Sequence, residues 1–175
     1  MKERGKMAKK EKTNVMRALE QQKIPYTAHQ YPHEGKAVDG TTVAGLIGKD
    51  VASVYKTLVT EGVSGEHYVF VLPVCKELDL KKAARAVGEK AVCMVHVAEL
   101  QRLTGYVRGG CSPIGMKKHY QTVLHSDAQN LDFLVVSAGR IGEQVELKPQ
   151  DLLRVTRGTC ADVARSADGK DNKPS

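Results

Sequence analysis

The sequence reads VASVYKTLVTEG at residues 51–62 and HYVFVLPV at residues 67–74, and both segments are rich in β-branched and aromatic residues. Two such segments joined by a short turn that contains glycine predict an antiparallel β-hairpin. Lys56 lies between Val54 and Leu58 on a face that is otherwise apolar, because side chains alternate along a strand. This lysine either extends to solvent from a sheet edge, which is the more common arrangement, or lies in a pocket beside an anionic or carbonyl group.

The segments on either side of the hairpin alternate between helical and extended patterns. Apolar residues at helical spacing, beside capping residues or glycines, predict helices at residues 14–23, 42–48, 77–88, 97–105 and 149–155. The expected caps of the first three helices are Thr13 or Asn14, Thr41 or Thr42, and Asp79. Besides the hairpin, strands are expected at residues 26–31, 91–95, 122–125, 132–139 and 144–148. Because most strands follow one another directly, we expect a single compact α/β domain, with a mixed sheet that curls towards a barrel and is flanked by helices.

Composition predicts a folded body between two tails. Of the net charge of +7, residues 1–12 contribute six basic and two acidic residues, whereas residues 166–175 hold two of each. We expect both ends to be flexible and residues 13–165 to form the domain. Apolar residues make up 41% of the chain, which excludes wholesale disorder, and no apolar run approaches the roughly 20 residues of a membrane span. The charged first residues lack the apolar core of a secretory signal, so a soluble cytoplasmic protein is expected.

One block within the domain is basic. Residues 101–126 contain Arg102, Arg108, Lys117 and Lys118 but no acidic residue. Such a block either faces a polyanion such as nucleic acid or forms an ordinary solvated surface, and charge alone leaves both alternatives open. The chain has no Trp and two Phe, which argues against an aromatic stacking platform for single-stranded nucleic acid.

A glycine-rich segment, GYVRGGCSPIG, lies in this block at residues 105–115. Its four glycines allow backbone amides to approach a ligand closely. The segment matches neither the GxGxxG pattern of dinucleotide binding nor the GK[ST] ending of a Walker loop. Taken alone, such a segment is more often a turn than a site.

The cysteines and histidines form no metal or disulfide pattern. His29 and His33 are four residues apart, but they lie on an expected strand and loop, where this spacing does not direct both rings to one point. We therefore expect no metal site. A nucleophilic pair of Cys111 with His33 or His119 stays open, although no spacing supports it. The four cysteines are widely spaced, which predicts reduced thiols; they are Cys75, Cys93, Cys111 and Cys160.

Five segments follow the order that is typical of the YbaK family, free-standing relatives of the editing domain in bacterial prolyl-tRNA synthetases. The combination of VYKTL with GYxxGGxSPxG is specific, and the resemblance covers about residues 14–165. Within the family, the chain resembles the Cys-tRNA(Pro) deacylases. The five segments are VYKTLV (54–59), LDLKKAARAVG (78–88), TGYVRGGCSPIG (104–115), VVSAGRIG (135–142) and ELKPQDLLRV (146–155).

The resemblance implies a pocket for the 3′ end of a mischarged tRNA, and hydrolysis in trans of the ester between cysteine and tRNA(Pro). Lys56 matches the family lysine that is placed to hold the terminal phosphate or the ester carbonyl. The substrate's own thiol is thought to attack the ester, so the protein mainly positions and stabilises it. The resemblance implies no cofactor or metal. It does imply a transient complex with prolyl-tRNA synthetase. The other positions that match family site residues are Tyr31, His33, Thr57, Gly109, Gly110, Ser112, Pro113, Ser137 and Gly139.

Two positions depart from the family pattern and keep alternatives open. Gln144 stands where relatives often carry an acidic residue that helps to position the amino group, and Cys111 stands where they are usually apolar. Because both departures, Gln144 and Cys111, bear on specificity, one alternative is a deacylase for alanine or serine on tRNA. A further alternative is a non-catalytic module that binds tRNA or a synthetase, with residues 101–126 against the RNA.

Overall fold

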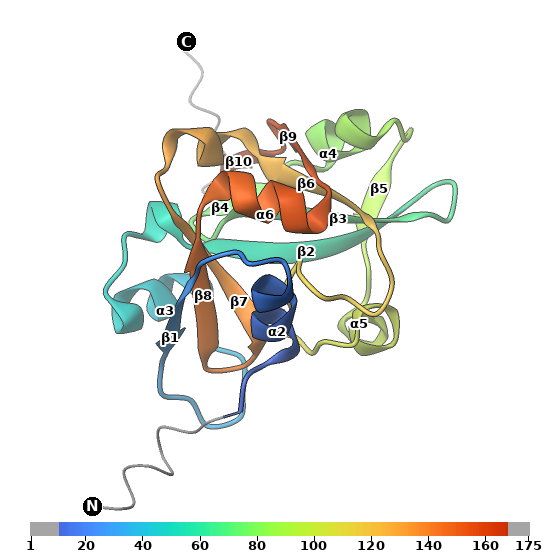
Figure 1. Cartoon of the computed structure of the whole chain (residues 1–175). Helices are drawn as coiled ribbons and strands as arrows, with labels where there is room; N and C mark the ends of the chain where they lie inside the picture. The colour runs from blue at the N-terminus through green and yellow to red at the C-terminus, as the bar shows by residue number, and fades with distance from the viewer. Residues whose placement is uncertain (1–10, 168–175) are drawn as a thin grey trace, which may run out of the picture.

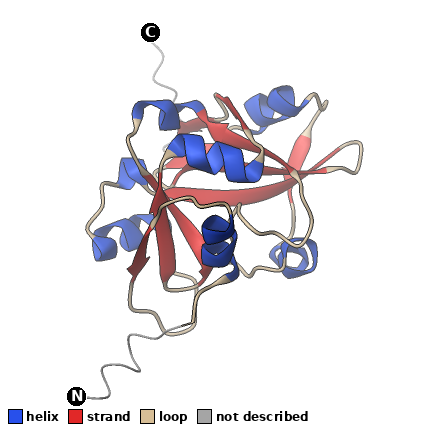
Figure 2. Cartoon of the chain, viewed as in Figure 1, coloured by secondary structure: helices blue, strands red, loops and turns tan. Residues whose placement is uncertain are grey.

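The computed structural model describes residues 11–167, so the predicted tails at 1–12 and 166–175 lie almost entirely outside the described residues (Figure 1). Helices and strands are interspersed along the described chain (Figure 2). The α-helices are α2 (Asn14–Gln21), α3 (Gly40–Ile47), α4 (Leu80–Val87), α5 (Val97–Thr104) and α6 (Pro149–Thr156), with 3-10 helices η1 (Val51–Ser53) and η2 (Ser126–Asn130). The strands are β1 (Thr27–Gln30), β2 (Tyr55–Gly62), β3 (His67–Pro73), β4 (Lys76–Leu78), β5 (Val92–Met94), β6 (Gln121–His125), β7 (Leu134–Arg140), β8 (Glu143–Leu147), β9 (Thr159–Ala161) and β10 (Ala164–Ser166).

The predicted helices are confirmed, with ends that shift by a few residues. Thr13 caps α2 because its hydroxyl accepts a hydrogen bond from the backbone N–H of Met16 at 3.1 Å. Asp79 caps α4 in the same way, and Gly88 ends that helix with a φ of 76°. Among residues 11–167, no helix is both long enough and apolar enough to cross a membrane.

The predicted cap of α3 is wrong. The capping residue is Asp39, whose carboxylate accepts hydrogen bonds from the backbone N–H groups of Thr41 and Thr42. Both threonine hydroxyls also donate to this carboxylate, at 2.7 Å each. Aspartate is a strong capping residue, and its position one residue before the helix decides the start.

The start of the hairpin and three short strands also differ from prediction. Residues 51–53 form η1 rather than a strand, because the Asp50 carboxylate accepts from the backbone N–H of Ala52 and caps a helical turn. The hairpin itself is confirmed, with β2 and β3 antiparallel. Strands β4, β9 and β10 carry too few residues for an alternating pattern, and each exists because a partner strand lies beside it.

The strands of residues 11–167 divide into three sheets. The largest has the order β5-β2-β3-β6-β9 and is mixed, since β3 runs parallel to β6 and antiparallel to β2. The second is antiparallel with the order β1-β8-β7, and the third pairs β10 with β4. A bridge between Val54 and Val135 brings the start of β2 to β7. A mixed α/β domain is therefore confirmed, although no sheet among residues 11–167 closes into a barrel.

The large sheet separates two apolar clusters, and alternate residues of β3 supply both. Val69 and Val71 pack on the side of α2, β7 and β8, whereas Phe70 and Leu72 pack on the side of α4 and β10. All four side chains are fully buried. This double burial makes the hairpin of β2 and β3 the centre of the fold, and it holds the residues at the start of β2 in place.

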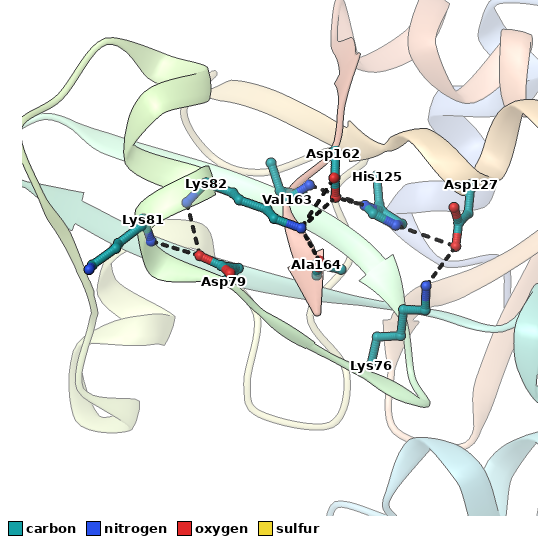
Figure 3. A network of polar contacts seen from close by, with 9 residues as sticks. All are labelled: Lys76, Asp79, Lys81, Lys82, His125, Asp127, Asp162, Val163 and Ala164. Carbon is teal, nitrogen blue, oxygen red and sulfur yellow. Dashed lines mark hydrogen bonds and ion pairs between the residues drawn. The ribbon is translucent and has the colours of Figure 1, made fainter. Parts of the chain in front are cut away.

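The buried ring of His125, at the end of β6, lies in a network of polar contacts (Figure 3). Its Nδ1 accepts a hydrogen bond from the backbone N–H of Val163 at 3.2 Å, and its Nε2 lies 3.4 Å from Asp127. Lys76 pairs with the same carboxylate at 3.0 Å, and Asp162 lies 3.8 Å from Nδ1. Burial lowers the pKa of His125, against the opposing charges of the two aspartates. Burial and the hydrogen bond that Nδ1 accepts therefore favour a neutral ring.

Mild acidification is expected to destabilise the fold through His125. Above its ordinary pKa of 6.5 the ring is neutral in both the folded and the unfolded chain, and it adds no pH dependence. Below that value the unfolded chain takes up the proton first, so the free energy of unfolding falls by up to about 1.4 kcal/mol per pH unit. The pKa of Asp127 is lowered from 3.8, so its contribution is lost only at more acidic pH.

Urea denaturation between about pH 7.5 and 5.5 measures this effect. His125→Gln keeps an acceptor for the Val163 N–H but cannot titrate, so its free energy of unfolding should change less over this range. An identical slope in the wild type and the variant would assign the pH dependence to other groups.

Candidate active site

A pocket lies where the start of β2 meets the glycine-rich segment and the ends of β7 and β8. We call it the main pocket, and its volume is about 190 Å³. Its lining residues are Tyr31, Val38, Gly40, Val43, Val54, Tyr55, Lys56, Thr57, Leu58, Val74, Arg108, Gly109, Cys111, Ser137 and Gln144.

Lys56 brings a half-buried ammonium group to the main pocket. Among the described residues, no hydrogen bond or ion pair engages this group. Burial lowers the pKa of Lys56, and the negative charge of Glu77 opposes that shift. A cation that has lost water without gaining a partner is suited to an anionic or carbonyl group of a ligand. The structure therefore favours the pocket alternative over extension of Lys56 to solvent.

Close backbone contacts build the wall beside Lys56. A Cβ atom on Gly109 would lie 2.7 Å from the Cβ of Ala37, and one on Gly110 would lie 2.9 Å from the backbone nitrogen of Ile141. Gly109 also has a φ of 87°, which side chains other than glycine rarely adopt. Gly109 lines the main pocket and Gly110 packs behind it. The glycines thus allow the loops at residues 32–39, 105–115 and 140–142 to pack together at this wall.

Three other predicted positions support the site without lining the main pocket. Ser112 is fully buried, and its hydroxyl accepts a hydrogen bond from the backbone N–H of Ile114 at 3.3 Å. Pro113 lines a separate small pocket. Gly139 has a φ of 95° and packs against the ring of Tyr106. These residues shape the segment and the strand end that carry the pocket.

Tyr31, Ser137 and Gln144 supply polar groups to the main pocket. Ser137 of β7 and Gln144 of β8 are direct neighbours in the antiparallel register, and both are buried. His33, which was predicted beside Tyr31, is exposed and does not line the pocket. Its Nδ1 accepts a hydrogen bond from the backbone N–H of Gly35 at 2.9 Å. His33 therefore stabilises the loop that leads to α3.

Two residues of β2 that line the pocket carry a buried hydroxyl group without a hydrogen-bond partner among the described residues, namely Tyr55 and Thr57. Sequence reasoning included Thr57 but missed Tyr55. The signal was present, because alternation along β2 places both residues on one face. Buried hydroxyl groups are normally paired, so the Thr57 hydroxyl is available to a ligand, whereas the Tyr55 hydroxyl is influenced by Asp127, Cys75 and Cys160, which do not line the pocket.

Cys111 lines the main pocket, but its surroundings do not favour a nucleophile. Burial raises the pKa of its thiol to about 12, so the thiol stays protonated near neutral pH. Among residues 11–167, those that line the pocket include no histidine and no carboxylate. The pair of Cys111 with a histidine is therefore not formed at this site.

The four basic residues of the block at 101–126, which are the candidates for contact with tRNA, lie in different parts of the structure. Arg108 lines the main pocket, whereas Arg102 lies on α5 and pairs with Glu99. Lys118 lies over the ring of Tyr120, 5.8 Å from its centre, and Lys117 is exposed nearby in the chain. In the described part of the chain, no cluster of three or more His, Cys, Asp or Glu residues is arranged to hold a metal ion.

Residues 36–155 match the profile of the aminoacyl-tRNA editing domain. The chain belongs to this family. It is also 44% identical over 160 residues to EbsC of Enterococcus faecalis, which is described as a Cys-tRNA(Pro)/Cys-tRNA(Cys) deacylase. That alignment covers 90% of this chain and 98% of EbsC. The family predicted from the five sequence segments is thereby confirmed.

Solved structures confirm the fold of the editing domain. A crystal structure described as a trans-editing enzyme for prolyl-tRNA synthetase is 26% identical, with a TM-score of 0.77 over 87% of this chain and 96% of that chain. The hypothetical protein APE2540 has a TM-score of 0.78 at 22% identity, over 87% of this chain and 99% of that chain, and shows likeness of fold alone.

Proposed function

We propose that this editing domain is a free-standing deacylase that hydrolyses Cys-tRNA(Pro), the product of mischarging by prolyl-tRNA synthetase. The observation that carries the proposal is a main pocket in which the described residues include an unpaired lysine and no general base, in a chain 44% identical to a Cys-tRNA deacylase. An ordinary hydrolase needs an activated nucleophile, whereas a cysteinyl ester brings its own thiol.

The reaction then needs positioning more than chemical groups from the protein. The substrate sulfur forms a bond to the ester carbonyl carbon, and the bond from that carbon to the ribose oxygen breaks. The tRNA leaves with the proton from the thiol, and water opens the resulting thiolactone to free cysteine. When the pocket holds the thiol within reach of the ester carbonyl, this intramolecular attack gains a large effective concentration. Proline has no side-chain nucleophile, so correctly charged tRNA is spared.

Within this proposal, Lys56 stabilises the negative charge that develops on the ester oxygen. Thr57, Ser137 and Gln144 hold the aminoacyl group through their pocket-facing polar atoms, and Tyr31 closes the pocket beside them. Gly109 allows the loop to approach the ester. The remaining predicted positions act through the loops that carry these residues.

A second candidate, a deacylase for alanine or serine on tRNA, concerns the amino-acid specificity of the pocket. Gln144 is buried in the pocket wall, where an acidic residue would attract the substrate ammonium group. A neutral amide is a weaker partner for that group. The position of Gln144 therefore makes amino-acid specificity the property to measure first.

The test compares the release of amino acid from Cys-tRNA(Pro), Ala-tRNA(Pro) and Ser-tRNA by the purified protein. Selective release of cysteine is expected. Release of alanine or serine instead would move the protein to the second candidate, and binding without turnover of any ester would leave a tRNA-binding module. A transient complex with prolyl-tRNA synthetase, expected of an enzyme that acts in trans, would appear as faster editing when the synthetase is added.

Substitution of Cys111 by serine should leave most of the activity on Cys-tRNA(Pro). The thiol is protonated and none of the described residues that line the pocket is a base, so it contributes packing rather than chemistry. Measurement of kcat/KM for the variant checks this. A loss as large as that of a Lys56 variant would show that Cys111 takes part in the reaction.

A further inference from the structure

Two further cavities adjoin the main pocket. The first, here called the side pocket, has a volume of about 340 Å³ and a wall that includes apolar side chains of β5 and α5. The second, which we call the rim pocket, has a volume of about 580 Å³ and lies beside the start of α3. Arg108 and Gly109 line all three cavities. The residues that line the rim pocket are Ala37, Val38, Asp39, Gly40, Thr41, Lys56, Val74, Arg108 and Gly109.

The three cavities differ in charge. The cations Lys56 and Arg108 line the main pocket, and Arg108 also lines the side pocket, but the described lining of these two cavities contains no carboxylate. Asp39 in the rim pocket is the one carboxylate among the described residues that line any of the three cavities. A cationic group of a ligand that occupies the main pocket therefore finds its opposite charge at Asp39.

The carboxylate of Asp39 is ionised and can accept a further hydrogen bond. Its Oδ1 accepts from the backbone N–H groups of Thr41 and Thr42 and from the hydroxyl of Thr41, whereas its Oδ2 accepts from the hydroxyl of Thr42 alone. The bonds from Thr42 and Thr41 lower the pKa of the carboxylate to about 2. Because a carboxylate oxygen has two lone pairs, Oδ2 is open to a donor, and the bonds to the cap hold the group in one orientation.

The positive groups of the rim pocket stand apart from this carboxylate. No ion pair joins Asp39 to Lys56 or Arg108 within the described part of the chain. An aminoacyl ester carries its carbonyl oxygen and its α-ammonium group on neighbouring carbon atoms. Opposite charges that are separated within one cavity match the two groups, because the carbonyl oxygen is attracted to a cation and the ammonium group to a carboxylate.

We propose that the rim pocket binds the α-ammonium group of the aminoacyl ester and that Asp39 holds this group. The subsite rests on the proposed function, since it assumes an ester in the main pocket with its carbonyl oxygen towards Lys56. Asp39 then supplies the acidic partner that Gln144 does not. With the carbonyl and ammonium groups both fixed, the side chain of the amino acid is left to face the main pocket.

The test uses two ligands that cannot be hydrolysed and that differ in the ammonium group. In one, cysteine is joined by an amide to 3′-amino-3′-deoxyadenosine, and in the other, 3-mercaptopropionic acid replaces the cysteine. Calorimetry gives the Kd of each at about pH 6.5, where an α-amino group with an ordinary pKa of about 7.7–8.0 is protonated. The wild type should bind the cysteinyl ligand about fivefold more tightly, because Asp39 is exposed and its charge pair keeps contact with water.

Asp39→Asn assigns that preference to its residue. Asparagine caps a helix about as well as aspartate, so α3 keeps its start while the charge is removed. The variant should bind the cysteinyl ligand about fivefold more weakly than the wild type does and bind the other ligand equally well. Asp39→Ser, a second uncharged cap, should give the same result, and the Tm of each variant checks that the fold is retained.

Asp79→Asn is the matched control. Asp79 caps α4 by accepting from the backbone N–H groups of Lys81 and Lys82, and it lines none of the three cavities. Its substitution should change neither Kd. Equal Kd values for the two ligands in the wild type would overturn the subsite. Equal weakening of both ligands by Asp39→Asn, or failure of the wild type to bind either ligand, would do the same.

These outcomes are independent of catalysis. The predicted pattern in a protein that does not release cysteine from Cys-tRNA(Pro) would retain the ammonium subsite and remove the proposed deacylase function. Release of cysteine without the predicted pattern would do the reverse.

Discussion

Lys56→Ala should lower kcat/KM for release of cysteine from Cys-tRNA(Pro) by about 100-fold or more, the usual loss when one group that stabilises an oxyanion is removed. The ammonium group is the one lysine cation in the described lining of the main pocket, and burial makes its field stronger there than in water. The effect should fall mainly on kcat, because charge on the ester oxygen develops in the transition state.

A measurement of Tm distinguishes loss of the Lys56 ammonium group from unfolding of the variant. Burial lowers the pKa of Lys56, which means that the folded chain disfavours its charged form. Lys56→Met removes that charge and keeps an apolar stem, so its Tm should equal or exceed that of the wild type while activity is lost. Lys81→Ala, on the exposed face of α4, is the control and should change neither property. Wild-type activity of Lys56→Ala with saturating tRNA would exclude Lys56 from catalysis.

Gly109→Ala should lower activity by about 100-fold, because displacement of the loop by about 1 Å misplaces the ester. The new Cβ would lie 2.8 Å from the Cα of Ala37, a backbone atom that cannot move aside alone. The left-handed φ of 87° adds about 1–2 kcal/mol of strain in the folded state.

A second glycine separates the effect of backbone strain from the effect of the contact with Ala37. Gly65, in the turn between β2 and β3, has a φ of 91°, and a Cβ there would meet nothing within 4 Å. Gly65→Ala should therefore lower the free energy of unfolding by the strain alone, about 1–2 kcal/mol, and keep full activity. Equal losses of stability in the two variants, with activity retained in both, would show that the contact of Gly109 with Ala37 is not needed for the site.

Local patterns accounted for most of the helices and for the central hairpin. Thr13, Asp79 and Gly88 act within one turn of chain, so their effects are visible without knowledge of distant segments. The strands β4, β9 and β10 were not visible in this way, because a strand of three residues gains its hydrogen bonds from a partner far along the chain.

The candidate site was predictable only in part for a related reason. Alternation and glycine content singled out Lys56 and Gly109, and the family resemblance added Tyr31, Ser137 and Gln144. The placement of Arg108 at the junction of three cavities, and of His33 outside them, depends on how the loops pack. No local signal distinguishes an arginine that faces a cavity from one that faces solvent.

The sequence by itself thus determined the family, the class of fold and the lysine around which the pocket is built, because these follow from short-range patterns and from motifs in a specific order. The tertiary structure alone decided that the strands of residues 11–167 form three sheets, that the side pocket adjoins the main pocket, and that no described residue of the main pocket is a base beside Lys56. The wall of the main pocket forms where loops from residues 32–39, 105–115 and 140–142 pack together, and the free energy of that packing depends on segments far apart in the sequence.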